Sequence, residues 1–304
     1  MQFIIFILVY PIIWFLSLLP FSVLYFLSDI IYFVLYYIVG YRKKVVRNNL
    51  NLSFPDKSDQ ELLKIEKKAM RHFVDTFVEM IKTFSLSEQD ILKRISIENI
   101  EEIERLIRNK KSVIIISSHH ANWEWPVHLM LHSVDCVGFG SYAKIQNKYF
   151  EKKIKQSRSK FGANLVVSSK FIRQMQKNND ENLQAIYGFI SDQSPLLKRA
   201  SYWNDFMSHR VPIIIGPELM AKRFDYPVIY IQNDRVKRGY YKTKIHVLTE
   251  SPRDLPDYQI TDMFLEVLEK QIRANPEYYF WTHNRFKHMG KEKQARVSRA
   301  KRKK

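Results

Sequence analysis

The first 41 residues are the most apolar part of the chain. They contain no Lys or Arg, and Asp29 is their only acidic residue. Pro11 and Pro20 interrupt the stretch and leave residues 12–19 and 21–41 as its apolar pieces. A helix that spans a bilayer needs about 20 apolar residues. The stretch therefore supplies either one tilted spanning helix or two segments that dip into the membrane and out again.

We expect residues 1–41 to be a retained membrane anchor. A secretory signal peptide needs a basic amino-terminal region and a small-residue cleavage site, and this stretch has neither. A helical hairpin buried in a soluble protein is the alternative. Arg42, Lys43, Lys44 and Arg47 follow directly. Such charges favour the cytoplasmic side of a membrane and bind anionic lipid head groups.

After residue 57 the apolar positions take on a helical period. Ser58 and Glu61 have the spacing of a capping box, which marks the start of a helix. Apolar residues then recur every three or four positions as far as Phe84, which predicts a long amphipathic helix. A second helix is expected over residues 98–108.

The four consecutive β-branched residues Val113–Ile116 predict a strand buried on both faces. A helix is expected over 127–131, with Pro126 in its first turn. Strand-like and helix-like runs then alternate. The predicted strands are 134–140, 163–168, 183–191, 227–232 and 240–248, and the predicted helices are 147–160, 170–177, 217–224 and 260–273. This alternation indicates an α/β fold with a mixed, largely parallel central sheet flanked by helices, over residues 42–290.

Three other segments have distinct expected forms. Residues 202–207 are too polar for a strand and too aromatic for a plain linker, so we expect a loop that lines a substrate site. Residues 235–240 should form a basic hairpin. The last 14 residues, 291–304, hold eight Lys or Arg against one Glu, which predicts a disordered tail drawn to a negative surface.

His119 and Glu124 lie in the turn that follows the central strand. Ligands and catalytic groups collect at the carboxyl ends of strands in open α/β sheets. The two residues suit a general-base pair, in which Glu124 accepts from one ring nitrogen and the other nitrogen takes a proton from a substrate hydroxyl. A structural histidine beside an exposed glutamate is the alternative.

Further candidate residues lie later in the chain. Asp192 and Gln193 close another predicted strand, where an Asx turn is the alternative to a site. Glu218 follows Pro217 at a helix start. A proline at the first position and an acid in the first turn are common there, so the default interpretation is that Glu218 has a structural role. Residues 281–287 mix aromatic and basic side chains, which suits an anionic substrate near a membrane.

The formal net charge of +18 and a pI of about 9.7 predict an acidic partner. Anionic lipid, a phosphorylated substrate, an acidic carrier protein and nucleic acid all fit this charge. The single cysteine, Cys136, excludes an internal disulfide framework and a cysteine-based metal cluster. A spacing of four relates His120, Glu124, His128 and His132, as in a zinc-binding helix, but Pro126 places His120 outside that helix. No metal is expected.

Taken together, these motifs resemble the bacterial lipid A biosynthesis acyltransferases, the lauroyl/myristoyl (late) acyltransferase family. Residues 118–124, Ser-His-His-Ala-Asn-Trp-Glu, are similar to the GHFGNWE form of that family's H-x4-D/E motif. Residues 41–55 resemble its YRR-x-V-x-x-NL-x-x-SFP segment, Asp192-Gln193 its DQ, residues 216–221 its GxE-x-x-A, and residues 281–287 its W-x-HxRxK. The Tyr-Trp-Asn-Asp-Phe and Gly-Pro-Glu segments look most like Bacteroidetes homologues.

The chain departs from the family pattern at two places. Ser118 stands where the motif has glycine, so the turn must accept a larger side chain. Residues 206–209, Phe-Met-Ser-His, lack the acid of the family's FFGE-like stretch, which leaves the acceptor and the chain-length preference open.

The resemblance implies a glycerolipid-acyltransferase-like fold and a membrane-bound O-acyltransferase at the cytoplasmic face of the inner membrane. It would move a fatty acyl chain from acyl carrier protein to a hydroxyl of a lipid A precursor, without a cofactor. His119 would be the general base and Glu124 its orienting acid. The substrate-binding candidates are Asn122, Trp123, Asp192, Gln193, Glu218 and, for phosphate groups, Arg42, Lys43 and Arg285.

Three rival functions stay open at this point. The acceptor could instead be an aminoacyl lipid or a phosphoglycolipid. A second possibility, of another class, is an inactive membrane-tethered protein whose basic tail binds anionic ligands, although no nucleic acid partner is expected. A zinc hydrolase is the third.

Overall fold

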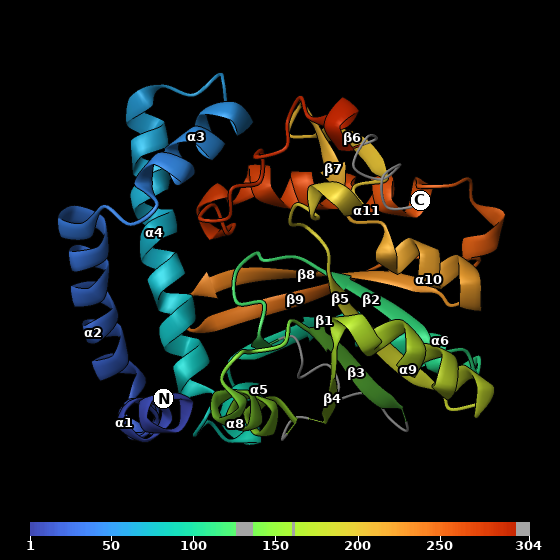
Figure 1. Cartoon of the computed structure of the whole chain (residues 1–304), viewed down its shortest axis with the longest axis horizontal. Helices are drawn as coiled ribbons and strands as arrows, with labels where there is room; N and C mark the ends of the chain where they lie inside the picture. The colour runs from blue at the N-terminus through green and yellow to red at the C-terminus, as the bar shows by residue number, and fades with distance from the viewer. Residues whose placement is uncertain (126–135, 160–161, 296–304) are drawn as a thin grey trace.

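The computed structural model describes residues 1–125, 136–159 and 162–295 (Figure 1). Its centre is a seven-stranded sheet in the order β1–β9–β8–β2–β5–β3–β4. The strands are β1 (Ile95–Glu98), β2 (Val113–Ser117), β3 (Val137–Tyr142), β4 (Ala163–Val167), β5 (Ala185–Ile190), β8 (Val228–Lys237) and β9 (Tyr240–Thr249). Neighbouring strands are parallel except for the β8–β9 hairpin. The predicted α/β fold is confirmed.

Strand β2 is buried on both faces, as its β-branched run predicts. Ile114 and Ile116 belong to the core on one face of the sheet, and Val113 and Ile115 to the core on the other. Helices α9 (Ser168–Asp180), α10 (Gly216–Phe224) and α11 (Gln259–Ala274) contribute to the first core, and α6 (Ile100–Arg108) to the second. The helix expected over 127–131 lies outside the described residues.

The amino-terminal stretch forms two helices, α1 (Gln2–Leu18) and α2 (Phe21–Phe33), followed by a π-helical turn at Val34–Val39. Pro20 separates α1 from α2, as predicted. The prediction that Pro11 also interrupts the stretch is wrong, because α1 continues through it. A proline removes one backbone hydrogen bond, and the neighbouring bonds carry the helix on.

Helix α2 lies alongside the long helix α4 (Asp59–Lys82) (Figure 1). The predicted capping box starts α4: the backbone N–H of Ser58 donates to Glu61 Oε2 at 2.9 Å, and the N–H of Glu61 donates to Ser58 Oγ at 3.3 Å. Arg238, in the turn after β8, bonds both Asp29 of α2 (2.7 Å) and Asp75 of α4 (2.5 Å). These contacts fix α2 to α4 and to the β8–β9 hairpin.

Residues 202–206 are not the substrate-lining loop that their composition suggested. They form strand β6 (Tyr202–Phe206), which pairs antiparallel with β7 (His209–Ile213). The two-residue turn between them, Met207-Ser208, has positive φ angles of 51° and 65°. Such turns usually contain Asn or Gly, so the residues of this turn gave no indication of a hairpin. Phe206 is 0% exposed and belongs to the core.

The start of the basic tail is ordered, against our expectation for residues 291–304. Ala295 packs with Ala200 and Trp203, and Glu292 forms an ion pair of 3.3 Å with Arg210 of β7. Residues 296–304 lie outside the described residues. The structured domain therefore extends at least to residue 295.

Candidate active site

Two parallel strands at the centre of the sheet bring His119 and Asp192 together. Ser117, the last residue of β2, lies opposite Ile190, the last residue of β5. His119 and Asp192 each come two residues later, so this register puts them level. His119 Nδ1 is 2.7 Å from Asp192 Oδ1, and the backbone N–H of His119 donates to Asp192 Oδ2 at 3.1 Å.

The hydrogen bonds define which ring nitrogen of His119 can act as a base. An ionised carboxylate only accepts hydrogen bonds, so Nδ1 carries the ring proton and Nε2 keeps its lone pair. The side-chain amide of Gln193 lies 3.3 Å from Nε2 and can donate to it. Burial acts to raise the pKa of Asp192, but its electrostatic interaction with His119 and the hydrogen bonds from His119 outweigh burial and hold this pKa below its ordinary value.

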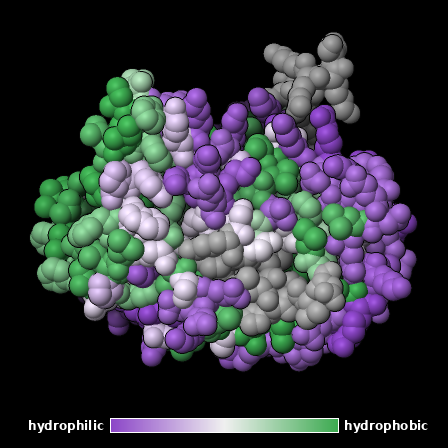
Figure 2. Space-filling model, turned by 90° about the horizontal axis from the view of Figure 1, so that it is seen from below, coloured by the Kyte–Doolittle hydropathy of each residue, from purple (hydrophilic) through white to green (hydrophobic). Residues whose placement is uncertain are grey.

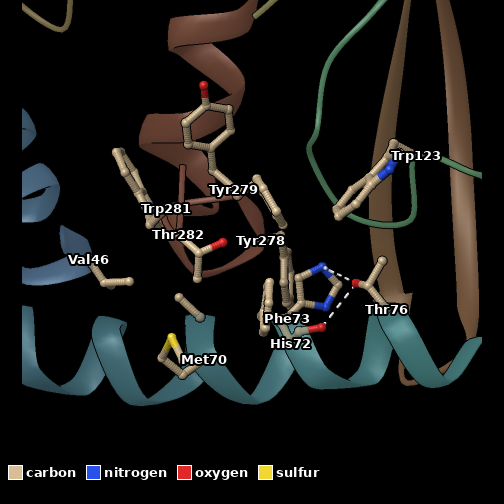
Figure 3. A pocket seen from close by; sticks show the side chains of 12 residues that line it. Val46, Met70, His72, Phe73, Thr76, Trp123, Tyr278, Tyr279, Trp281 and Thr282 are labelled. Atoms are coloured by element: carbon tan, nitrogen blue, oxygen red, sulfur yellow. Dashed lines mark hydrogen bonds between the residues drawn. The ribbon is translucent and has the colours of Figure 1, made fainter. Parts of the chain in front are cut away.

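Aromatic side chains hold the ring of His119 in place. Phe280 stacks on it with ring centroids 5.6 Å apart, and Trp123 packs against it at 5.1 Å. The backbone N–H of Phe280 donates to the carbonyl of His119 at 3.1 Å. Figure 3 shows Trp123 facing a small hollow whose other walls come from Val46, α4 and residues 278–282. Its volume of about 10 Å³ leaves room for little more than one water molecule.

Glu124 does not contact His119, contrary to the expected pair. Its carboxylate forms a two-point ion pair with Arg158 of α8 (Lys148–Ser159), at 2.7 and 2.5 Å. The physical reason is an Asx turn, in which Asn122 Oδ1 accepts the N–H groups of Glu124 and Trp125, both at 3.1 Å. The acid that orients His119 in the structure is Asp192. No pattern in the sequence marked Arg158, which is one of several basic residues on an amphipathic helix.

Two apolar cavities meet at the Glu124–Arg158 ion pair. One, of about 140 Å³, is bounded by the sheet, with Phe139, Leu165 and Phe189 in its wall. The other, of about 210 Å³, lies among α1, α4 and α8, with Ile13, Met80 and Ile154 in its wall. Linings of this kind suit hydrocarbon, and the ion pair gives both cavities a polar boundary.

The turn from 118 to 125, which we call the catalytic turn, accommodates the unusual residues of its motif. Ala121 has a left-handed backbone conformation (φ 54°), and it stands where the GHFGNWE motif has its second glycine. Ser118 instead places its hydroxyl 3.1 Å from that of Tyr230. Asn122 is 0% exposed and its side chain is engaged within the protein. Direct substrate binding by Asn122, as predicted, is therefore corrected to a role in shaping the turn.

Comparison with known proteins now identifies the family. A family model described as bacterial lipid A biosynthesis acyltransferase matches residues 1–288. The chain belongs to this family. The lipid A biosynthesis palmitoleoyltransferase of Escherichia coli (strain K12) is 22% identical over 258 residues, which cover 81% of this chain and 79% of that protein. The lipid A biosynthesis acyltransferase of Shigella flexneri matches with the same values. The protein is thus an acyltransferase, and its family implies a lipid A precursor as acceptor.

Two predicted substrate contacts of this lipid A acyltransferase are corrected by burial. Arg285 is 1% exposed, and its Nη1 donates to Ser194 Oγ and to the carbonyl of Pro212, both at 3.3 Å. It has no surface to offer a phosphate. Glu218, at 2% exposed, accepts from the N–H and hydroxyl of Thr261 at 2.9 and 2.6 Å. It therefore serves the start of α11.

Arg42 and Lys43 lie at the surface of the acyltransferase, at the end of the amino-terminal stretch. Arg42 Nη1 lies 3.4 Å from the carbonyl of Thr282, and the Lys43 ammonium lies 4.1 Å from the ring centre of Tyr36. Neither cation forms an ion pair among the described residues. Phosphate binding by these two residues stays a prediction.

Within the described ranges, no three His, Cys, Asp or Glu side chains gather in a metal-binding arrangement. His128 and His132, which the zinc alternative requires, lie outside those ranges. His120 is fully buried, and its ring nitrogens lie 3.2 Å from the carbonyl of Asn233 and 3.1 Å from that of Asn275.

The acyltransferase should lose stability in mild acid because of His283. Burial, with help from Lys287, lowers the pKa of His283 from 6.5 to about 4, and its Nε2 accepts the N–H of Ser194 at 3.2 Å. Between these two pKa values the unfolded chain binds more protons than the folded chain. The contribution of His283 to the free energy of unfolding is therefore complete above pH 6.5 and is lost as the pH drops toward 4. We expect a lower thermal midpoint at pH 5 than at pH 7.5, measured in detergent. A His283→Gln variant should show a smaller drop, and an equal drop would contradict the assignment.

Proposed function

We propose that the enzyme moves a fatty acyl chain from acyl carrier protein to a hydroxyl group of a lipid A precursor, with His119 as the general base. The observation that carries this proposal is the His119–Asp192 pair, which leaves the lone pair of Nε2 beside Gln193. A buried carboxylate that holds a histidine in one tautomer is a common arrangement for activating a hydroxyl.

In the proposed reaction, Nε2 of His119 removes the proton of the acceptor hydroxyl while that oxygen attacks the thioester carbonyl. Asp192 stabilises the imidazolium that forms. The tetrahedral intermediate then expels the carrier thiolate, which takes the proton back from His119. The amide of Gln193, displaced from Nε2 by the substrate hydroxyl, is placed to donate to the oxygen of the intermediate.

The Glu124–Arg158 ion pair supports a role in substrate placement. Both residues border the two apolar cavities, so the polar linkage of a substrate can lie at the ion pair while its hydrocarbon occupies a cavity. Trp123, in the wall of the cavity beside the sheet, would contact that hydrocarbon. This role replaces the orienting role first expected of Glu124.

The charge of the protein supports an acidic donor and an anionic acceptor. A net charge of +18 steers an acidic carrier protein toward the enzyme. Arg42 and Lys43 lie at the surface where phosphate groups of a lipid precursor can reach them, and basic side chains pair well with phosphate oxygens.

We propose that residues 1–41 attach the enzyme to the inner membrane through its cytoplasmic leaflet. The segment Phe21–Val39 is long and apolar enough to cross a bilayer. However, both ends of the stretch contact the catalytic domain: Asn147 donates to the carbonyl of Gln2 at 2.9 Å, and Arg42 lies beside Thr282. Figure 2 shows apolar side chains gathered over the end of the molecule where α1 and α2 lie. These observations support insertion into one leaflet.

Acyl transfer by the detergent-solubilised enzyme tests the proposed function. Labelled acyl groups on acyl carrier protein and on coenzyme A are offered with a lipid A precursor, an aminoacyl lipid or a phosphoglycolipid. We expect transfer to the lipid A precursor, with the carrier protein as the better donor. Preferred transfer to another lipid would overturn the acceptor, and equal use of coenzyme A would overturn the donor.

Cysteine labelling in sealed inner-membrane vesicles tests the attachment. Single cysteines at Gln2 and Tyr41, with Cys136 replaced by serine, should both react with a membrane-impermeant reagent from the cytoplasmic side only. Labelling of the two positions from opposite sides would show a spanning segment instead.

A further inference from the structure

Glu79, near the carboxyl end of α4, is a buried carboxylate that the proposed reaction does not use. It is 0% exposed. Three neutral groups from three different elements donate to it: the hydroxyl of Tyr25 on α2 at 2.8 Å, the amide of Asn122 in the catalytic turn at 2.7 Å, and the hydroxyl of Tyr241 on β9 at 2.7 Å. Glu79 forms no ion pair among the described residues, and burying an acid without one is costly, so these three donors compensate for its burial.

The contacts of Asn122 connect Glu79 to the position of the substrate-facing residues. One side of the Asn122 amide donates to Glu79, and the other accepts the backbone N–H groups of Glu124 and Trp125. Those two bonds set the direction in which Glu124 leaves the turn toward Arg158.

A second contact from the same end of α4 fixes the next part of the turn. The carbonyl of Glu79 accepts the hydroxyl of Thr83 at 3.0 Å, and Thr83 Oγ1 accepts the indole N–H of Trp125 at 3.1 Å. The end of α4 therefore holds the catalytic turn at both Asn122 and Trp125. Because Tyr25 donates to the same carboxylate, α2 shares in this support.

We propose that Glu79 is a positioning residue for acyl transfer. Because Tyr25 donates to Glu79, we infer that helix α2 helps to position the active site in addition to attaching the enzyme to the membrane. The inference rests on the proposed function, because its effect is a displacement of Glu124 and Trp123 relative to His119. An error of about 1 Å in such a position can lower a rate by about 10²-fold.

The chain offers a matched control on the same helix. Glu66 of α4 is 1% exposed and accepts from the hydroxyl of Tyr36 at 2.7 Å and from Arg47 at 2.5 Å. Like Glu79, it is a buried acid bonded to a tyrosine of the amino-terminal stretch. Unlike Glu79, it has no hydrogen bond to the catalytic turn among the described contacts.

The test compares Glu79→Gln with Glu66→Gln, and Tyr25→Phe with Tyr36→Phe, for kcat, KM and thermal midpoint. The Glu79→Gln substitution replaces one acceptor oxygen with an NH₂ group, which cannot accept a hydrogen bond from Tyr25, Asn122 or Tyr241. We expect Glu79→Gln to lower kcat by about 10-fold to 100-fold with little change in KM. Tyr25→Phe should lower kcat by a smaller factor, and the two control variants should keep the wild-type kcat even where their thermal midpoints fall.

Equal effects of the paired variants on kcat would show that Glu79 only stabilises the fold and would overturn the proposal. The phenylalanine pair decides the question if Glu79→Gln does not fold, because each member removes a single hydroxyl. In an Asn122→Ala background, Glu79→Gln should cause no further loss of kcat, and an additive loss would also count against the proposal. Inactivity of the wild type would instead contradict the proposed function, so the two failures are distinguishable.

Discussion

Replacing His119 with alanine is expected to lower kcat for acyl transfer by a factor of about 10²–10⁴, the usual contribution of a general base. Nε2 of His119 is the ring nitrogen that keeps a lone pair, since Nδ1 is committed to Asp192. Without it, the acceptor hydroxyl has to lose its proton to water. The measurement is the steady-state rate of transfer to a lipid A precursor, with the carrier-linked donor and the precursor both saturating.

His246→Ala is the control for the His119 variant. His246 is a part-buried histidine on β9 that contacts Gln232 at 3.0 Å, and its replacement should leave kcat near the wild-type value. A folded His119→Ala enzyme with wild-type kcat would rule out the proposed base and leave the pair with a structural role.

Replacing Asp192 with asparagine is expected to have an effect of similar size, about 10²–10⁴ in kcat. The side-chain NH₂ of asparagine donates, so it favours the tautomer in which Nδ1 holds the lone pair and Nε2 holds the proton. The base would then be blocked although the shape of the site is kept. The double variant with His119→Ala should be no worse than either single variant, because the two residues act as a unit.

The Glu124→Gln variant separates the two acids of the site. It leaves the His119–Asp192 pair intact but weakens the ion pair with Arg158. We expect a rise in KM with a smaller fall in kcat, because the variant weakens a contact that binds the substrate before and during the reaction. A displaced but intact ion pair, as expected for Glu79→Gln, lowers kcat instead. If Glu124→Gln instead lost kcat as strongly as Asp192→Asn with KM unchanged, Glu124 would act on the proton and our division of roles would be wrong.

The sequence predicted the elements of this fold well where local patterns decide them. The β-branched run at Val113–Ile116 and the capping box at Ser58 each follow from side-chain shape or local hydrogen bonding, and both are confirmed. The β6–β7 hairpin was missed because its turn uses Met207 and Ser208, residues without the usual preference for positive φ.

The site was predictable in its residues but not in its pairings. His119, Asp192 and Gln193 were singled out as strand-end residues, yet which acid would meet His119 depended on the register of β2 with β5, strands some 70 residues apart in the chain. Local spacing favoured Glu124 instead. Arg158 and Glu79 are helical residues whose partners lie on other elements, and a single sequence carries no mark of such contacts.

The β8–β9 hairpin also determines when helices α2 and α4 can form their final contacts during synthesis. Arg238 of the hairpin is the partner of Asp29 and Asp75, and Tyr241 of β9 is a partner of Glu79. These residues emerge about 200 positions after the first two helices, a delay of roughly 10–40 s at typical rates of translation. During that interval the acids of α2 and α4 lack these cations, and edge strand β1 lacks β9, its neighbour in the sheet. Helices α2 and α4 can therefore make their contacts with the β8–β9 hairpin only after the last strand of the sheet has been made.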